Sequence, residues 1–158
     1  TEKLDSCFSG GYFDITNEPD LGYPYLYDEI PGNEWKTQQL VRKIISGSFK
    51  NAPDGLPGND DCGTLSAWLV FYMMGLYPAC PGSNQYQLTS PSFPKISIEL
   101  DPAYYSGKNF VIEATQQPEE NTFIRSLLLN SKPYKKFCLD HETITRGGRL
   151  EFNLKHQP

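Results

Sequence analysis

Positive charge is scarce in this sequence. The 158 residues include 14 lysines and arginines against 19 aspartates and glutamates, so the formal net charge at pH 7 is -5. The basic residues form no cluster. A protein that binds nucleic acid or an anionic membrane needs a basic face, because it must displace counterions from phosphates. The composition therefore argues against these partners and predicts a neutral or cationic one.

Hydrophobic runs of membrane-spanning length are also missing. The longest apolar run, residues 65–77, is interrupted by Ser66 and Gly75. It is shorter than the roughly 20 residues that a membrane span requires, and it is typical of a buried helix. The chain opens on Thr1 with no signal-peptide pattern, so we expect any targeting segment to have been removed or to lie upstream.

Common motifs of metal, phosphate and nucleophilic chemistry are lacking. The cysteines are Cys7, Cys62, Cys80 and Cys138, without a C-x-x-C pair or a zinc-type spacing. Buried free thiols are the expectation, although a disulfide between two of them stays open. The glycine pairs at 10–11 and 147–148 fit no phosphate-binding loop. Both histidines, His141 and His156, are expected to be structural, which leaves carboxylate chemistry.

The hydrophobic period changes along the chain from helical to alternating. Helical spacing of apolar residues predicts a helix over 34–49, and the strongly apolar segment 64–76 is predicted to be a helix with apolar groups on nearly all sides. A short helix is expected around 25–27, after Pro24, whereas 4–22 shows no sustained period and is predicted to be a loop. After Pro81, alternation predicts strands around 96–100, 110–114, 123–129 and 150–154. We therefore predict an α+β fold, with a helical segment, residues 1–83, followed by a small antiparallel β-sandwich, residues 84–158.

Two acid-bearing loops lie next to predicted helix starts, where unpaired backbone N–H groups favour negative charge. Asp60 and Asp61 precede the apolar helix, so we expect one to cap it and the other to face a cleft. Asn17 and Glu18 offer hard oxygen ligands, which suit calcium better than zinc. The plainer interpretations are a cap with a solvated acid in one loop and an ordinary turn in the other.

Several motifs occur in the order in which one enzyme family carries them. They are Phe-Asp-Ile-Thr-Asn-Glu-Pro-Asp at 13–20 with Pro-Tyr-Leu-Tyr at 24–27, Trp-Lys-Thr-Gln at 35–38, Gly-Leu-Pro-Gly-Asn-Asp-Asp-Cys-Gly at 55–63 with Ser-Ala-Trp at 66–68, Ser-Pro-Ser-Phe at 90–93, Ile-Arg-Ser at 124–126, Leu-Asn at 129–130 and His141. Together they resemble the C-terminal third of the α-mannosidases of glycoside hydrolase family 92. The resemblance covers nearly the whole chain.

The resemblance implies a Ca2+-dependent, inverting exo-α-mannosidase with an N-terminal β-sandwich and an (α/α)6 barrel, of which the helical segment would be the end. Ca2+ would hold the 2- and 3-hydroxyls of a terminal mannose. By resemblance, the calcium ligands are Asn17, Glu18 and the Thr16 carbonyl, the general base is Asp61 with Asp60 beside it, and Asn59 and Glu18 bind substrate. Asp61 is favoured because it is nearer the helix start, but the sequence does not separate the two acids.

The chain also departs from the family pattern. The family's general acid, a glutamate upstream of the first motif, has no counterpart here, so we expect a piece of a longer enzyme that is inactive alone. Gly22 stands where the family often has a histidine, so a contact to sugar or calcium is expected to be missing.

Mannose-containing glycans and the remainder of the same enzyme are the partners that the resemblance implies. The implied location is secreted, periplasmic or on the cell surface. Two alternatives stay open. One is an inactive family member, and the other is a non-catalytic sugar-binding or scaffold module, in which Tyr104, Tyr105 and Tyr134 would stack on sugar rings.

Overall fold

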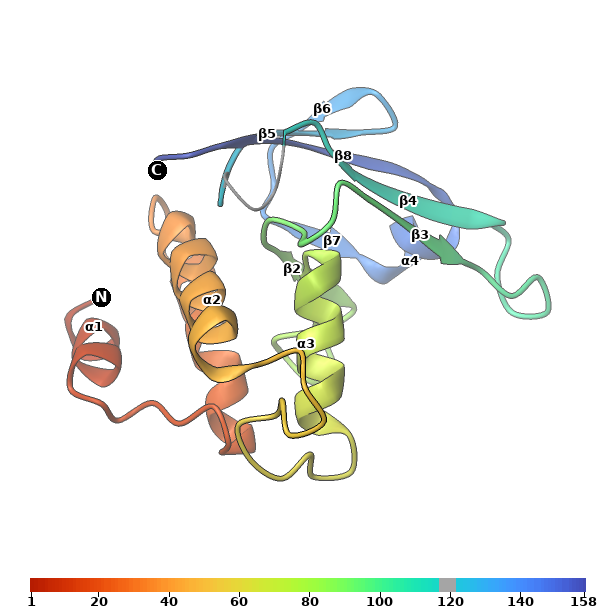
Figure 1. The fold of residues 1–158 in the computed structure, drawn as a ribbon. Coiled ribbons are helices and arrows are strands. Elements are labelled where there is room, and N and C mark those ends of the chain that lie inside the picture. The colour runs from red at the N-terminus through yellow and green to blue at the C-terminus, as the bar shows by residue number, and fades with distance from the viewer. Residues whose placement is uncertain (117–121) are drawn as a thin grey trace. The chain divides into compact units, whose positions relative to one another are not determined.

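The computed structural model describes residues 1–116 and 122–158, which form a mixture of helices and strands (Figure 1). The chain divides into two compact units, residues 1–70 and 71–158, which we call the helical unit and the β unit. The helical elements are α1 (Glu2–Ser9), the 3-10 helix η1 (Glu18–Glu29), α2 (Glu34–Ser48), α3 (Thr64–Met74) and α4 (His141–Thr145). The α+β expectation is confirmed, while the barrel and the sandwich stay predictions.

The division between the units lies inside α3, earlier than the predicted limit at residues 83–84. Residues just after it already bond to the β unit. The N–H of Ser92 donates to the Met73 carbonyl (2.9 Å), and the N–H of Thr89 donates to the Gly75 carbonyl (3.0 Å). The hydrophobic period shows where helical spacing ends, whereas these bonds show which unit a residue joins. The limits 1–83 and 84–158 stay a prediction for the domains of a longer protein.

Helices α2 and α3 form where the sequence predicted them, α2 from the helical spacing of its apolar residues and α3 from a strongly apolar segment. Helix α2 buries Val41 and Ile44 on one face. Helix α3 ends at Gly75, whose φ of 78° is unfavourable for a residue with a side chain. The short helix expected around 25–27 is a longer 3-10 helix, η1, which contains Pro24. Proline has no N–H to donate, which favours such irregular helical turns over a regular α-helix.

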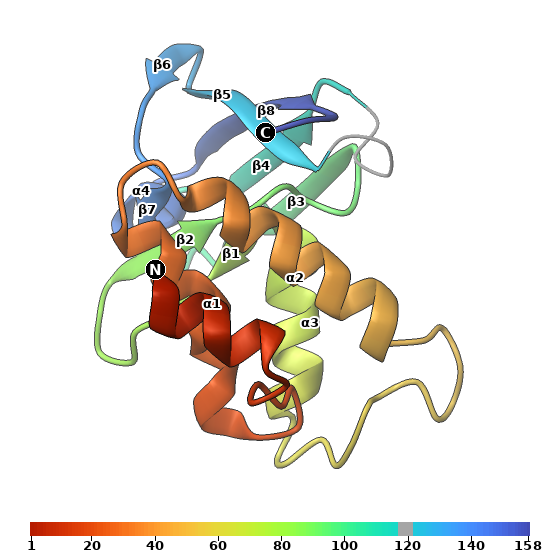
Figure 2. The same ribbon diagram turned by 90° about the vertical axis from the view of Figure 1, so that its left-hand side faces the viewer.

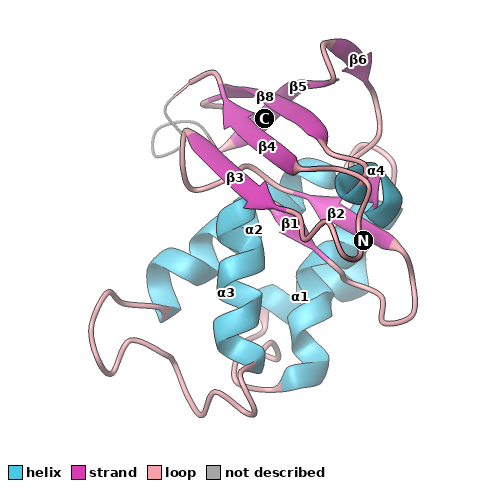
Figure 3. Ribbon diagram, turned by 90° about the vertical axis from the view of Figure 1, so that its right-hand side faces the viewer, coloured by secondary structure: helices cyan, strands magenta, loops and turns pink. Residues whose placement is uncertain are grey.

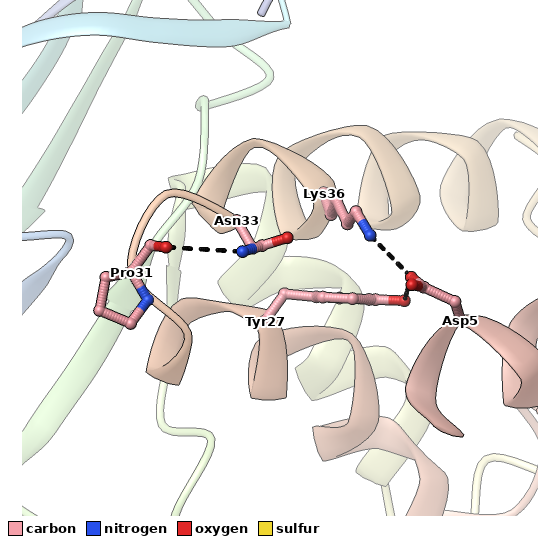
Figure 4. A network of polar contacts seen from close by, with 5 residues as sticks. All are labelled: Asp5, Tyr27, Pro31, Asn33 and Lys36. Atoms are coloured by element: carbon pink, nitrogen blue, oxygen red, sulfur yellow. Dashed lines mark hydrogen bonds and ion pairs between the residues drawn. The ribbon is translucent and has the colours of Figure 1, made fainter. Parts of the chain in front are cut away.

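The prediction of a loop over residues 4–22 is wrong at both ends, because α1 runs from Glu2 to Ser9 and η1 already begins at Glu18. The apolar residues of α1, Leu4, Cys7 and Phe8, have helical spacing, but the helix has only 8 residues and none of them is fully buried, so the sequence signal is short. Tertiary contacts hold it beside α2 (Figures 2 and 4). The Asp5 carboxylate accepts hydrogen bonds from Lys36 Nζ (2.8 Å) and Tyr27 Oη (2.6 Å), and both bonds lower the pKa of Asp5.

The strands of the β unit form two sheets (Figure 3). One has the order β1 (Leu76–Tyr77), β2 (Gln85–Leu88), β7 (Cys138–Asp140). The other has the order β3 (Lys95–Glu99), β4 (Asn109–Ala114), β8 (Gly148–Lys155), β5 (Phe123–Leu129), β6 (Lys132–Tyr134). All four predicted strands are present. Their inward residues join a cluster of buried side chains that includes Phe110, Ile112, Leu150 and Phe152, each 0% exposed.

The expectation of a purely antiparallel unit is wrong for one pair, because β4 and β8 run parallel. Parallel neighbours need a long crossover connection, and here the chain from 115 to 147 supplies it. Sequence alternation places a side chain on a face of a strand but does not give the direction of the neighbouring strand.

All four cysteines are free thiols, as expected, but none is fully buried: Cys7 and Cys138 are partly buried, and Cys62 and Cys80 are exposed. In the part of the chain that the structure describes, every helix is too short or too polar to cross a bilayer.

Candidate active site

The loop that leads into η1 is braced by two aspartates. The Asp14 carboxylate accepts hydrogen bonds from the N–H (2.9 Å) and the hydroxyl (2.8 Å) of Thr16, which hold the pKa of Asp14 below its usual range. Asp20 is only 5% exposed and accepts from the Asp14 N–H (2.9 Å) and from Asn17 Nδ2 (2.9 Å). The plainer interpretation of this motif, a turn that bonds its own backbone, is therefore correct for Asp14 and Asp20.

The same bracing orients the predicted calcium ligands. An ionised carboxylate only accepts hydrogen bonds, so the Asn17 NH2 group faces Asp20 and the Asn17 Oδ1 is directed away from it. Within residues 1–116 and 122–158, this Oδ1 and the exposed carboxylate of Glu18 have no hydrogen-bond partner.

The donors of this loop fit a hard cation in kind. With the Thr16 carbonyl they make an all-oxygen set, although calcium takes about 6–8 oxygens and the remainder must come from elsewhere. The described residues contain no group of three or more His, Cys, Asp and Glu side chains that could hold a metal ion. The donors predicted here include only one residue of these types, Glu18.

At the start of α3, the first of the adjacent acids is fully engaged. Asp60 Oδ1 accepts a hydrogen bond from the Ser66 N–H (2.8 Å), and Oδ2 accepts one from the Ser66 hydroxyl (2.6 Å). These bonds, with the hydroxyl contributing most, lower the pKa of Asp60. Asp60 therefore satisfies an N–H group of the first turn of the helix, which is the capping role expected of one of the two acids.

Asp61 has a different environment. Its side chain is exposed, and among the described residues its carboxylate has no hydrogen-bond partner. Its backbone is left-handed, with φ values of 47° at Asp61, 60° at Cys62 and 91° at Gly63. This conformation costs roughly 1–2 kcal/mol for a residue with a side chain, and such strain is concentrated at functional sites. The Asp61 carbonyl accepts from the N–H (3.2 Å) and hydroxyl (2.7 Å) of Thr64, which hold the turn.

Tertiary folding brings the two loops side by side. A Cβ placed on Gly58 would lie 2.9 Å from Thr16 Cγ2. The backbone of the loop that precedes Asp60 therefore packs against the loop that carries the predicted calcium ligands. Nearby, Trp68 Nε1 of α3 donates to the Leu21 carbonyl of η1 (3.2 Å). Asn59, the predicted substrate ligand, is exposed and follows Gly58 directly. Its role, like the contact expected to be missing at Gly22, stays a prediction.

Sequence reasoning missed two residues that position this site, Asp20 and Ser66. The spacing Asn17-x-x-Asp20 was a usable signal, because residues three apart meet within one turn of a helix. Ser66 gave a weaker signal, since it lies six residues beyond Asp60 and contacts it only because the chain reverses at Asp61 and Cys62.

The family model for the glycosyl hydrolase family 92 catalytic domain matches residues 1–156. The chain belongs to this family. An uncharacterized secreted glycosidase of Arthroderma benhamiae is 32% identical to it over 154 residues, which are 96% of this chain and 19% of that protein.

Two solved family 92 structures from Bacteroides thetaiotaomicron are similar to the chain. One, an α-mannosidase, has a TM-score of 0.90 and 34% identity over 99% of this chain and 21% of its own. The other, an inverting mannosidase, has a TM-score of 0.80 and 36% identity over 90% of this chain and 19% of its own. The chain thus spans about a fifth of the length of these family 92 relatives.

Proposed function

We propose that this family 92 chain supplies the general base and part of the calcium site of an inverting exo-α-mannosidase that removes terminal mannose from glycans. The observation that carries the proposal is the contrast between the adjacent acids. Asp60 is bonded to Ser66, whereas Asp61 is free of partners in the described structure and lies on a strained turn. The α-mannosidase and inverting mannosidase among the similar structures support the substrate class and the stereochemistry.

The base must accept a proton from the attacking water. Both oxygens of Asp60 already accept hydrogen bonds from Ser66, and its lowered pKa makes it a weaker base. The exposed Asp61 carboxylate is free to accept the proton, and the bonds from Thr64 to its own carbonyl hold it in place. The general acid would come from another part of the longer enzyme.

The calcium ligands in this proposal are Asn17 Oδ1, the Glu18 carboxylate and the Thr16 carbonyl, with Asn59 and Glu18 contacting the sugar. When bound, calcium would fix the 2- and 3-hydroxyls of the mannose and favour a distorted ring. Asp20 contributes by holding the Asn17 amide, so that its oxygen is directed outward before any ligand arrives. A secreted, periplasmic or cell-surface location is part of the proposal, since one relative is a secreted glycosidase.

The test uses the longer enzyme and an aryl α-mannoside. Asp61→Asn is expected to lower kcat by about 10²–10⁴-fold, because a positioned base is lost while the shape of the side chain is kept. Asp54→Asn, which changes an exposed acid of the same loop, is the matched control and should leave kcat unchanged. The 158-residue chain alone is expected to be inactive, since it lacks the acid.

Proton NMR of a fresh digest reports the stereochemistry. In an inverting enzyme the general acid and the general base stand roughly 6.5–9.5 Å apart, which leaves room for the attacking water. Attack by that water inverts the anomeric carbon, so the β-anomer of mannose should be released first. Initial release of α-mannose would show that a nucleophile acts in place of a base. A larger loss for a folded Asp60→Asn protein than for Asp61→Asn would assign the base to Asp60. An enzyme without any turnover that still binds glycans would favour the sugar-binding module or the inactive family member.

A further inference from the structure

A continuous series of aromatic rings lies on the β unit. It consists of Tyr104, Tyr105, His141 and Tyr86, which we call the aromatic strip. Successive ring centroids are 6.4, 6.2 and 6.0 Å apart, and Tyr86 stacks in turn on Phe71 at 6.1 Å. Tyr104 is 80% exposed and Tyr105 is 37% exposed. The rings lie next to one another, and those of Tyr104, Tyr105 and His141 are exposed, whereas Tyr86 is partly buried and packs against the core of the β unit.

The aromatic strip is held in shape by backbone bonds. The N–H groups of Tyr104 and Tyr105 both donate to the Asp101 carbonyl, at 3.1 and 3.0 Å. His141 begins α4 directly after β7, which pairs with β2, the strand that carries Tyr86. Three separate segments thus present their rings from an ordered backbone, so a ligand that stacks on them has to order side chains but not the chain itself.

The edges of the strip can form hydrogen bonds. Tyr86 Oη lies 3.0 Å from His141 Nδ1, and this hydrogen bond occupies Nδ1. In the described part of the chain, His141 Nε2 and the hydroxyls of Tyr104 and Tyr105 have no hydrogen-bond partner. A sugar ring has a C–H face that stacks on aromatic rings and an edge of hydroxyls, so it matches both properties of the strip.

The charges around the strip disfavour an anionic ligand. Asp101 and Asp140 flank it, and Glu142 follows His141 with its carboxylate paired to Arg146 (2.7 Å). Single-stranded nucleic acid also stacks its bases on aromatic side chains, but its phosphates need a cationic groove. We propose that the aromatic strip is a second carbohydrate site that binds a neutral mannose chain, an identity that rests on the proposed function.

The binding test measures the affinity of the 158-residue chain for linear α-mannotetraose by titration calorimetry. Tyr104→Ala and Tyr105→Ala are each expected to weaken binding about tenfold. Tyr104→Phe and Tyr105→Phe keep the rings, so their affinity for mannotetraose should stay within about threefold of the wild type. These variants also serve as a control for misfolding of the alanine variants. Tyr12→Ala removes a tyrosine of the helical unit that is 78% exposed, and it should leave the affinity unchanged.

An unchanged affinity in the Tyr104→Ala/Tyr105→Ala double variant would overturn the proposal. Tighter binding of a proline-rich peptide or of single-stranded DNA than of mannotetraose would also overturn it. A loss of mannotetraose binding in the Asp61→Asn chain, with no loss in the tyrosine variants, would place binding at the loops of the helical unit and would overturn the proposal. In the longer enzyme, tyrosine-dependent binding without mannoside hydrolysis would support the strip while contradicting the proposed function.

Discussion

The β unit and the helical unit differ in what they bury. The largest buried cluster of the β unit is entirely apolar, with side chains contributed by six strands and α4. The helical unit buries Asp20, Thr37 and Gln38 alongside its apolar residues. It also contains the left-handed turn at Asp61 and Cys62. The β unit also buries Thr89 and Ser90 and has left-handed residues at Asn130 and Ser131, so the difference lies in charge: among the described residues, only the helical unit buries a carboxylate, that of Asp20. A buried carboxylate needs hydrogen-bond donors to offset its lost hydration, whereas the apolar cluster of the β unit is stabilised by packing.

The clearest example of a buried polar group in the helical unit is the carboxyl group of Asp28, in η1. Both of its carboxyl oxygens are buried and have no hydrogen-bond partner among the described residues. The Thr37 hydroxyl lies near enough to lower the pKa of Asp28, but its one hydrogen is donated to the Pro24 carbonyl (3.0 Å). Burial dominates, followed in the same direction by the charges of Glu34 and Glu29, and raises the pKa to about 8.

The largest expected effect on stability tests the apolar side of this comparison. Phe152→Ala removes a ring of β8 that is 0% exposed, and it should lower the free energy of unfolding of the β unit by about 3–5 kcal/mol. Urea unfolding measures the change. The matched control is Phe93→Ala, which removes a ring that is 50% exposed and should cost far less. Similar losses in the two variants would mean that the β unit is not held by this cluster.

A smaller, pH-dependent effect tests the polar side. The folded pKa of Asp28 lies above its unfolded value of 3.8, so the folded chain keeps a proton that the unfolded chain releases, and stability falls as pH rises from about 4 to about 8. Asp28→Asn removes this slope. Relative to the wild type, the variant should gain stability between pH 5 and pH 8, by at most a few kcal/mol.

The measurement is urea unfolding at several pH values, with Asp54→Asn as the control for an exposed acid. A constant difference between Asp28→Asn and the wild type across this pH range would contradict the buried neutral carboxyl.

The smallest effect concerns the acid that caps α3. Ser66→Ala deletes the hydroxyl that donates to Asp60, so the pKa of Asp60 should rise toward its usual value and Tm should fall by about 2–4 °C. NMR titration of the carboxyl and thermal unfolding report the two changes. Ser6→Ala on the exposed surface of α1 should change neither. An unaltered Asp60 titration would show that Ser66 does not engage it in solution.

Regular elements were predictable where one face of a long segment is apolar. Helix α2 and the four longer strands follow from the spacing of residues such as Val41, Ile112 and Phe152. Helix α1 and strands β1, β2, β6 and β7 were missed, because they are short or lack a buried stripe. The parallel pairing of β4 with β8 was missed because alternation is the same in both strand directions.

The sequence by itself determined the α+β class, the acidic and amide residues available for chemistry and, through ordered motifs, the family to which the chain belongs. Only the tertiary structure decided that Asp60 is bound by Ser66 and Asp61 is not, that the Gly58 loop lies against Thr16, and that Tyr104, Tyr105, His141 and Tyr86 form one strip. Residue type and spacing set what a side chain can donate or accept. Which partner it meets depends on contacts between segments far apart in the chain, and these exist only once the chain has folded.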